Sequence, residues 1–297
     1  MALLASSTPL LVAAVFALGL LVGSFLNVVI YREPIRLRRE WAADCERLAG
    51  REPAPQPRFN LLTPRSACPA CQAPITALQN IPVVSFVALK GRCARCGVRI
   101  SWRYPAVELL TAALSALVAW RFGPTLACAA ALIVTWFLIA LSWIDYDTQY
   151  LPDSLTLPLL WLGLAASLLV GGLGPAGLGQ PLPVAPRAAI LGAMLGYLSL
   201  WSVYWLFKLL TGKEGMGYGD FKLLAALGAW LGAAALLPIV LLSALVGSIV
   251  GIVLIVARGR DRRLPIPFGP YLAAAGWLTM LFGNELAAAW TRLVLRG

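Results

Sequence analysis

The stretch Gly215-Met216-Gly217-Tyr218-Gly219-Asp220 decides how the rest of this sequence is interpreted. It places a carboxylate behind three glycines, directly before a long apolar run over residues 221 to 257. An ionised aspartate at a membrane boundary costs free energy, and its presence there indicates a function. The nearest upstream counterpart is Asp145-Tyr146-Asp147, which ends another apolar run. Two such carboxylates, brought together, could activate a water molecule.

Composition places the chain among polytopic membrane proteins. Of its 297 residues, 60% are hydrophobic and 12% are charged, which leaves too little polar surface to cover a soluble globule. The sequence contains no histidine. Histidine-dependent serine, cysteine and zinc protease sites are therefore excluded, and acid–base chemistry near neutral pH must use carboxylates, lysine, tyrosine or cysteine.

The apolar runs predict an all-α protein with about eight transmembrane helices. The long run after Asp220 is divided at Pro238. The expected spans cover residues 8–30, 106–120, 124–144, 154–172, 188–210, 221–236, 239–257 and 268–290. We expect three parts: a first transmembrane helix over 1–30, a cytoplasmic loop domain over 31–105, and a membrane domain of about seven helices over 106–297.

The distribution of basic residues predicts the topology. Residues 31–105 hold thirteen Lys or Arg against five Asp or Glu, so this segment is expected in the cytoplasm, with its cations touching inner-membrane lipid and with no nucleic-acid partner. The loop over 258–267 carries four arginines against one aspartate and agrees with this orientation, while the Gly/Pro-rich piece over 171–186 becomes an external connector. The same topology places six acidic residues at the inner face, namely Glu108, Asp145, Asp147, Asp153, Glu214 and Asp220.

Each aspartate has an alternative structural role. Asp153 follows Pro152 at the start of a span and fits a helix N-cap, and Asp147 fits a solvated loop residue. Asp145 follows the apolar Trp143-Ile144 and is expected to lie deeper. Asp220 could also cap a helix, but a cap does not require three glycines, whereas Gly217 and Gly219 let a neighbouring chain approach the backbone closely.

A pair of neighbouring carboxylates could hydrolyse a peptide without histidine or a catalytic metal. Two such groups a few ångströms apart do not both ionise, so one keeps a proton near neutral pH. The ionised partner can act as general base on water, while the protonated partner polarises the scissile carbonyl and returns a proton to the leaving amine.

Four cysteines predict a structural metal site in the polar loop. Cys68-Pro69-Ala70-Cys71 and Cys93-Ala94-Arg95-Cys96 form two Cys-x-x-Cys pairs with the spacing of a zinc ribbon. A cytoplasmic location disfavours disulfides. Four protein ligands close the coordination shell, so the Zn²⁺ is expected to be structural; a redox pair or unmetallated thiols are the alternatives.

The ordered motifs of the chain resemble the type IV prepilin leader peptidase and N-methyltransferase family, a group of GxGD aspartic proteases of the bacterial inner membrane. Besides the two cysteine pairs, the resemblance rests on Gly23-Ser24-Phe25-Leu26-Asn27-Val28-Val29-Ile30-Tyr31-Arg32, Asn80-Ile81-Pro82, Arg103-Tyr104-Pro105-Ala106-Val107-Glu108, Ile144-Asp145-Tyr146-Asp147, Leu151-Pro152-Asp153, residues 212–222 and Pro265-Ile266-Pro267-Phe268-Gly269-Pro270-Tyr271.

This resemblance implies cleavage of the basic leader of type IV prepilins or type II secretion pseudopilins on the cytoplasmic side, followed by N-methylation from S-adenosylmethionine. It maps the catalytic aspartates onto Asp220 and the first acidic position after the third span, which we take as Asp145 with Asp147 in reserve; Gly217 and Gly219 are candidate supporting residues. The cysteines favour the bifunctional form.

The position of the methyl donor does not follow from the sequence, because no glycine loop after a strand occurs in residues 31–105. Glu108 and the zinc-ribbon loop are the candidates by their place at the inner face, although Glu108 could equally anchor Arg103 or cap its helix. Two functions of other classes remain: an ion-coupled transporter using the same aspartates, and an interaction module carried by the zinc loop.

Overall fold

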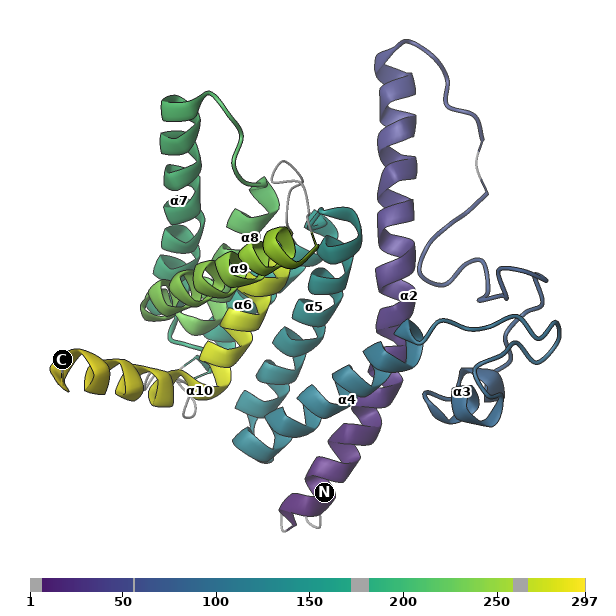
Figure 1. Ribbon diagram of the computed structural model, residues 1–297, viewed down its shortest axis with the longest axis horizontal. Helices are drawn as coiled ribbons and strands as arrows, with labels where there is room; N and C mark the ends of the chain where they lie inside the picture. Colours follow the sequence, from purple (N-terminus) through teal and green to yellow (C-terminus); the bar gives the residue numbers. More distant parts are fainter. Residues whose placement is uncertain (1–6, 56, 172–181, 259–266, 297) are drawn as a thin grey trace. The chain divides into compact units, whose positions relative to one another are not determined.

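The computed structural model describes residues 7–55, 57–171, 182–258 and 267–296. Within these residues the only β-structure is two isolated bridges, Ala67–Pro74 and Arg92–Arg99, so the all-α prediction is confirmed. The long helices are α2 (Thr8–Leu48), α4 (Arg103–Phe122), α5 (Leu126–Thr148), α6 (Asp153–Val170), α7 (Pro186–Thr211), α8 (Tyr218–Leu231), α9 (Leu236–Arg258) and α10 (Gly269–Arg296) (Figure 1). The short helix α3 (Val84–Ala88) and 3-10 turns at Leu78–Asn80 and Ala233–Ala235 complete the described elements.

All eight expected apolar runs are helical, but only six described helices are long and apolar enough to cross a membrane. These are Thr8–Leu48, Arg103–Phe122, Leu126–Thr148, Asp153–Val170, Pro186–Thr211 and Ala233–Val256. Helix α8 has 14 residues, about 21 Å of helix, which is shorter than the roughly 30 Å hydrocarbon core of a bilayer. Helix α10 is not among the six either. The structure therefore supports six spanning helices by this criterion, where the sequence predicted about eight.

Two predicted helix boundaries were wrong. The first helix does not end at residue 30 but continues to Leu48, with Pro34 inside it. The long run after Asp220 is broken at Gly232, whose φ of +80° ends α8 in a conformation that favours glycine. Pro238 lies instead in the first turn of α9, where its missing N–H has no partner within the helix to lose.

Two predicted loops cannot be compared in full. Residues 259–266, with the loop arginines Arg260, Arg262 and Arg263, lie outside the described residues, as do residues 172–181 of the Gly/Pro-rich connector.

The chain divides into two compact units, residues 1–120 and 121–297, here called the N-terminal and C-terminal units. In the N-terminal unit, α2 crosses α4 at very short range. A Cβ on Gly19 would lie 2.7 Å from the Ala112 Cα, and a Cβ on Gly23 would lie 2.7 Å from the Glu108 Cα. Small residues spaced by four permit such an approach between membrane helices.

Helix α8 forms the core of the C-terminal unit. Every one of its residues from Asp220 to Leu231 except Lys222 is buried, and it packs against α6, α7 and α10. The contact with α7 is again between backbones, since a Cβ on Gly192 would overlap the Gly228 carbonyl oxygen and a Cβ on Gly196 would lie 2.6 Å from the Leu224 oxygen. Trp230 Nε1 donates to the Leu159 carbonyl of α6 (2.9 Å). Asp220 is thereby held at the end of a rigid element.

Candidate active site and metal centre

Asp145 lies in the last turn of α5 and is only 5% exposed. The helix ends at Gln149, which adopts a left-handed conformation and donates its N–H to the Asp145 carbonyl oxygen (2.8 Å). The Asp145 carboxylate accepts a buried hydrogen bond from the backbone N–H of Gly269, with 2.9 Å between N and Oδ2. A carboxylate buried to this extent requires such a donor.

Asp220 lies in the first turn of α8, three residues after the N-cap Gly217, and is 8% exposed. It lies outside the six helices that are long enough to span a membrane. Burial raises the pKa of the Asp220 carboxyl to about 7, and the charge of Asp145 acts in the same direction. The two sequence-predicted aspartates thus lie near enough to interact, and such a pair favours holding one shared proton near neutral pH.

The glycines around Asp220 do not all meet the same surroundings. A Cβ on Gly219 would lie 2.7 Å from the Leu151 Cβ, and one on Gly215 would lie 2.8 Å from the Phe207 ring. Beside Gly217 the nearest heavy atom to such a Cβ is Asp220 Oδ2, at 3.9 Å. Gly215 and Gly219 are therefore required by packing within the chain, whereas the backbone beside Gly217 is open to a close approach.

The other carboxylates that the sequence predicted at the inner face are exposed or engaged elsewhere. Asp147 is exposed, and two residues along a helix place it on a different side of α5 from Asp145. Asp153 does not cap α6, because Pro152 holds the N-cap position; instead both Asp153 oxygens accept from Lys222 Nζ at 2.7 Å. Glu214 pairs with Lys208 (2.8 Å).

Sequence reasoning missed two residues of this site. Gly269 touches Asp145, and Lys222 fixes the start of α8 to that of α6. Both belong to quoted motifs, Pro267-Phe268-Gly269-Pro270 and Asp220-Phe221-Lys222, so a signal existed. Gly269 contributes a backbone N–H, however, and the residue type does not show that this N–H would contact Asp145.

Four cysteine sulfurs gather in the N-terminal unit. The Sγ atoms of Cys68, Cys71, Cys93 and Cys96 all lie within 4.8 Å of one another, and those of Cys68 and Cys96 are 3.8 Å apart. A tetrahedral Zn²⁺ with sulfur ligands at about 2.3 Å requires sulfurs about 3.8 Å apart. The donor set and its spacing therefore fit zinc.

Two equivalent turns present these sulfurs. In the first turn, Cys68 donates its N–H to the Ala73 carbonyl and accepts at its own carbonyl from the Gln72 N–H. In the second turn, Cys93 is bonded in the same way to the Val98 carbonyl and the Gly97 N–H. The fourth residue after each of these cysteines has a positive φ, +56° at Gln72 and +72° at Gly97. The repeated geometry is typical of the knuckles of a zinc ribbon.

Glu108 is buried and anchors the polar loop. Its Oε2 accepts from the backbone N–H of Val83 (2.8 Å), a residue with a positive φ of 59°, and the Ser24 hydroxyl of α2 hydrogen-bonds the same carboxyl. Arg32, on the same helix as Ser24, is 7% exposed and donates to the carbonyl oxygens of Asn60 (2.9 Å) and Pro64 (2.7 Å) in the loop. These contacts fix the loop to the helix pair.

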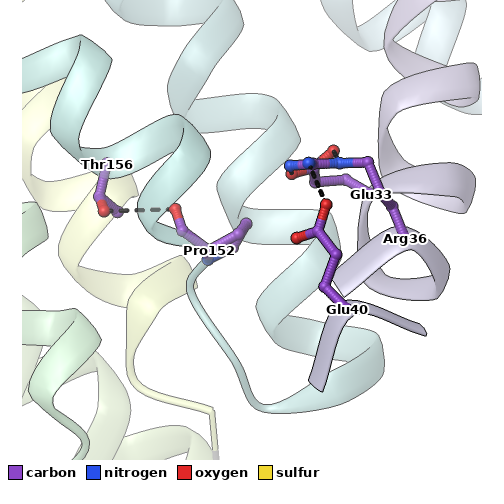
Figure 2. A network of polar contacts seen from close by, with 5 residues as sticks. All are labelled: Glu33, Arg36, Glu40, Pro152 and Thr156. Carbon is purple, nitrogen blue, oxygen red and sulfur yellow. Dashed lines mark hydrogen bonds and ion pairs between the residues drawn. The ribbon is translucent and has the colours of Figure 1, made fainter. Parts of the chain in front are cut away.

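The polar continuation of α2 is stabilised by ion pairs. Figure 2 shows Arg36 between Glu33 and Glu40, with N–O distances of 2.5 and 2.7 Å. The pairs join residues three and four apart and so support the helix beyond the predicted boundary. In the C-terminal unit, the same figure shows Thr156 donating its hydroxyl to the Pro152 carbonyl (3.2 Å) at the start of α6.

Comparison with known families matches both parts of the chain. Residues 17–122 match the bacterial peptidase A24 N-terminal domain, and residues 132–252 match the type IV leader peptidase family. The second match contains Asp145 and Asp220, and the first contains the four cysteines. No solved structure matches the chain.

Curated relatives cover nearly the whole chain. Proteins named prepilin leader peptidase/N-methyltransferase match from Aeromonas salmonicida (55% identity over 95% of this chain and 94% of the relative) and Pseudomonas aeruginosa (52%, over 95% and 94%). A protein of the same name from Neisseria gonorrhoeae is 50% identical over 91% of this chain and 90% of its own length.

Proposed function

Since the chain belongs to the type IV leader peptidase family, we propose that it cleaves the leader of type IV prepilins or type II secretion pseudopilins with Asp145 and Asp220, and then N-methylates the new N-terminus. The observation that carries the proposal is the burial of both aspartates in one site, with the pKa of Asp220 raised to about 7. An ion-coupled transporter is not favoured by the relatives' names.

The aspartate pair performs the hydrolysis by general acid–base catalysis. The ionised aspartate takes a proton from water, and the resulting hydroxide attacks the scissile carbonyl carbon while the protonated aspartate donates to the carbonyl oxygen. When the C–N bond breaks, the leaving amine takes the first proton, and the second aspartate recovers its own from the tetrahedral hydroxyl. The pair is regenerated with one proton, as it began.

The surroundings of Gly217 fit an extended substrate. Among the described residues, the only heavy atom within 4 Å of a Cβ on Gly217 is Asp220 Oδ2. A substrate backbone can therefore approach beside Asp220, as the cleavage of a segment next to a hydrophobic helix requires. Asp147 is a reserve for Asp145, but it is exposed and lies on a different side of α5 from Asp145.

The four cysteines hold a structural Zn²⁺ in this proposal. Their sulfurs match the tetrahedral distances, and four protein ligands leave no open position for water. A bound zinc ion would stabilise the fold of the loop that follows α2, within the segment 31–105 that we place in the cytoplasm because of its excess of basic residues. The enzyme would thus lie in the bacterial inner membrane with its site facing inward.

S-adenosylmethionine supplies the methyl group, and the N-terminal unit is where we expect it to bind. Glu108 was the sequence candidate for this contact, but its carboxyl is engaged by Val83 and Ser24. That engagement supports a role in holding the loop. The rate of methyl transfer to a pre-cleaved peptide, compared between the wild type and Glu108→Gln, tests whether Glu108 also contacts the methyl donor.

A purified-protein assay tests the peptidase proposal. The substrate is a peptide with a basic leader, a glycine cleavage site and a hydrophobic segment. Asp145→Ala and Asp220→Ala are expected to lose leader removal, with Asp147→Ala as the matched control that retains it. Normal cleavage by either of the first two variants would contradict the pair. For zinc, the metal content of the wild type is compared with that of Cys68→Ser/Cys93→Ser, and equal content would rule out the ribbon.

A further inference from the structure

The start of α10 faces the carboxylate of Asp145. Gly269 is the first residue of α10, and its N–H donates to Asp145 Oδ2 across 2.9 Å in a buried position. The Phe268 carbonyl already accepts from Tyr271 and Leu272, at 3.1 Å each. Gly269 N–H is among the first amides of the helix, which have no partner within it. The next residue, Pro270, has no N–H, so Gly269 is the donor at this position.

The geometry admits no side chain at residue 269. A Cβ there would lie 2.6 Å from Asp145 Oδ2, 3.1 Å from its Cγ and 3.3 Å from Leu151 Cδ1. Such distances are below van der Waals contact, and the Asp145 carboxylate cannot withdraw without breaking the hydrogen bond. The glycine is thus required by the closeness of the carboxylate and not by its own backbone conformation.

A backbone N–H at a helix start stabilises the charged form of a carboxylate, both as a donor and through the helix dipole. Asp220 lies in the first turn of α8 as well, but burial and the charge of Asp145 outweigh that advantage and favour its protonated form. Lys222, the nearest cation in the sequence, is engaged with Asp153. The two carboxylates of the site are therefore not equivalent.

We propose that Gly269 is a positioning residue of the proposed reaction: its N–H holds Asp145 ionised as the general base, so that the shared proton resides on Asp220, the general acid. Occupation of Oδ2 by this donor leaves Oδ1 to take the proton from water. Asp220 then protonates the carbonyl oxygen, and the leaving amine receives its proton from Asp145. This inference rests on the proposed peptidase function and assigns the two roles within it.

A matched pair of glycine variants on α10 tests the positioning role. Gly269→Ala removes the close approach to Asp145. Gly276→Ala, on the same helix, places a Cβ 2.7 Å from the flexible end of Leu227, away from either aspartate. Cleavage of the prepilin peptide is measured in the purified full-length enzyme, together with methyl transfer to an already cleaved peptide and the melting temperature.

Gly269→Ala is expected to lower the kcat of cleavage about 100-fold with KM within about threefold, because loss of one oriented donor acts on the reacting state. Methyl transfer and the melting temperature should stay near those of the wild type, and Gly276→Ala should keep kcat within about fivefold. An unchanged kcat in Gly269→Ala, or an equal loss in both variants, would overturn the proposal.

The role assignment is tested separately, so that it does not depend on the folding of a glycine variant. Asp220→Asn keeps a neutral hydrogen-bond donor for the carbonyl, whereas Asp145→Asn has no base. The residual kcat of Asp220→Asn should exceed that of Asp145→Asn by about tenfold or more, and equal residual rates would overturn the assignment. Full cleavage by both would instead contradict the peptidase proposal itself.

Discussion

At the scale of single residues, depth and charge separate the aspartates that the sequence left together. Asp145 and Asp220 are buried, Asp147 is exposed, and Asp153 is paired with Lys222. Because the pKa of Asp220 is raised to about 7, its proton is present below that pH and is lost above it.

Cleavage should therefore fall as the pH rises through about 7 toward 9, because the general acid then loses its proton. The measurement is kcat/KM for the prepilin peptide from pH 5.5 to 9, in the absence of the methyl donor. A rate that keeps rising to pH 9 would contradict the assignment of the protonated partner.

Residue identity predicted some of these features and not others. The cluster of four cysteines was predicted from residue type and spacing, and the family resemblance pointed to Asp145 as the partner of Asp220. The burial of Asp145 was predicted from the apolar Trp143-Ile144 before it. Gly269 and Val83 act through backbone amides, however, and the sequence does not show where a backbone N–H points.

At the scale of elements, an ion pair ties the helix that carries Asp220 to its neighbour. Lys222 of α8 donates to both oxygens of Asp153 in α6, at 2.7 Å. Half of the Asp153 side chain is exposed (48%), so the pair is worth about 1 kcal/mol after solvent screening.

Lys222→Met should lower the melting temperature by a few degrees and lower cleavage more than methyl transfer, because the start of α8 is loosened. The charge exchange Lys222→Asp/Asp153→Lys should recover part of the loss. If Lys222→Met cleaves like the wild type, the pair does not position Asp220.

The contact between α7 and α8 makes a second prediction at this scale. Gly192→Ala should destabilise the protein by about 2 kcal/mol or more, because its Cβ would overlap the backbone oxygen of Gly228, which cannot move aside. Gly247→Ala is the matched control, since its Cβ would meet the Tyr271 ring at 3.3 Å. Unfolding is followed by heating in detergent, and equal melting temperatures for the two variants would contradict the close contact.

The sequence predicted which segments form helices more accurately than it predicted where those helices end. Apolar runs marked every long helix. The first helix was predicted to end with the apolar run at residue 30, yet Arg36 pairs with Glu33 and Glu40 and the helix continues to Leu48. The break after α8 depends on the positive φ of Gly232, whereas Pro238, the stronger breaker by composition, is tolerated in a first turn.

At the scale of the whole molecule, the candidate catalytic aspartates and the cysteine cluster belong to different units. The aspartates lie in the C-terminal unit and the cysteines in the N-terminal unit. Composition predicted the membrane class because 60% hydrophobic residues leave too little polar surface for a soluble globule. Among the described residues, six helices are long and apolar enough to span a membrane, and the 14-residue α8 is instead buried by its neighbours.

Removing the metal should therefore separate the activities. Cys68→Ser/Cys93→Ser is expected to lose zinc and to lower methyl transfer by at least about tenfold, while cleavage falls less. Metal content and both rates are measured on one preparation. A larger loss of cleavage than of methyl transfer would contradict this division between the units.

The most direct test of the central claim is the rate of leader removal by purified Asp145→Asn and Asp220→Asn, with methyl transfer to a pre-cleaved peptide measured on the same preparations. Both variants are expected to lose at least about 10³-fold in cleavage while methyl transfer stays near the wild-type rate. Cleavage at the wild-type rate by either variant, in protein that still methylates, would contradict this claim.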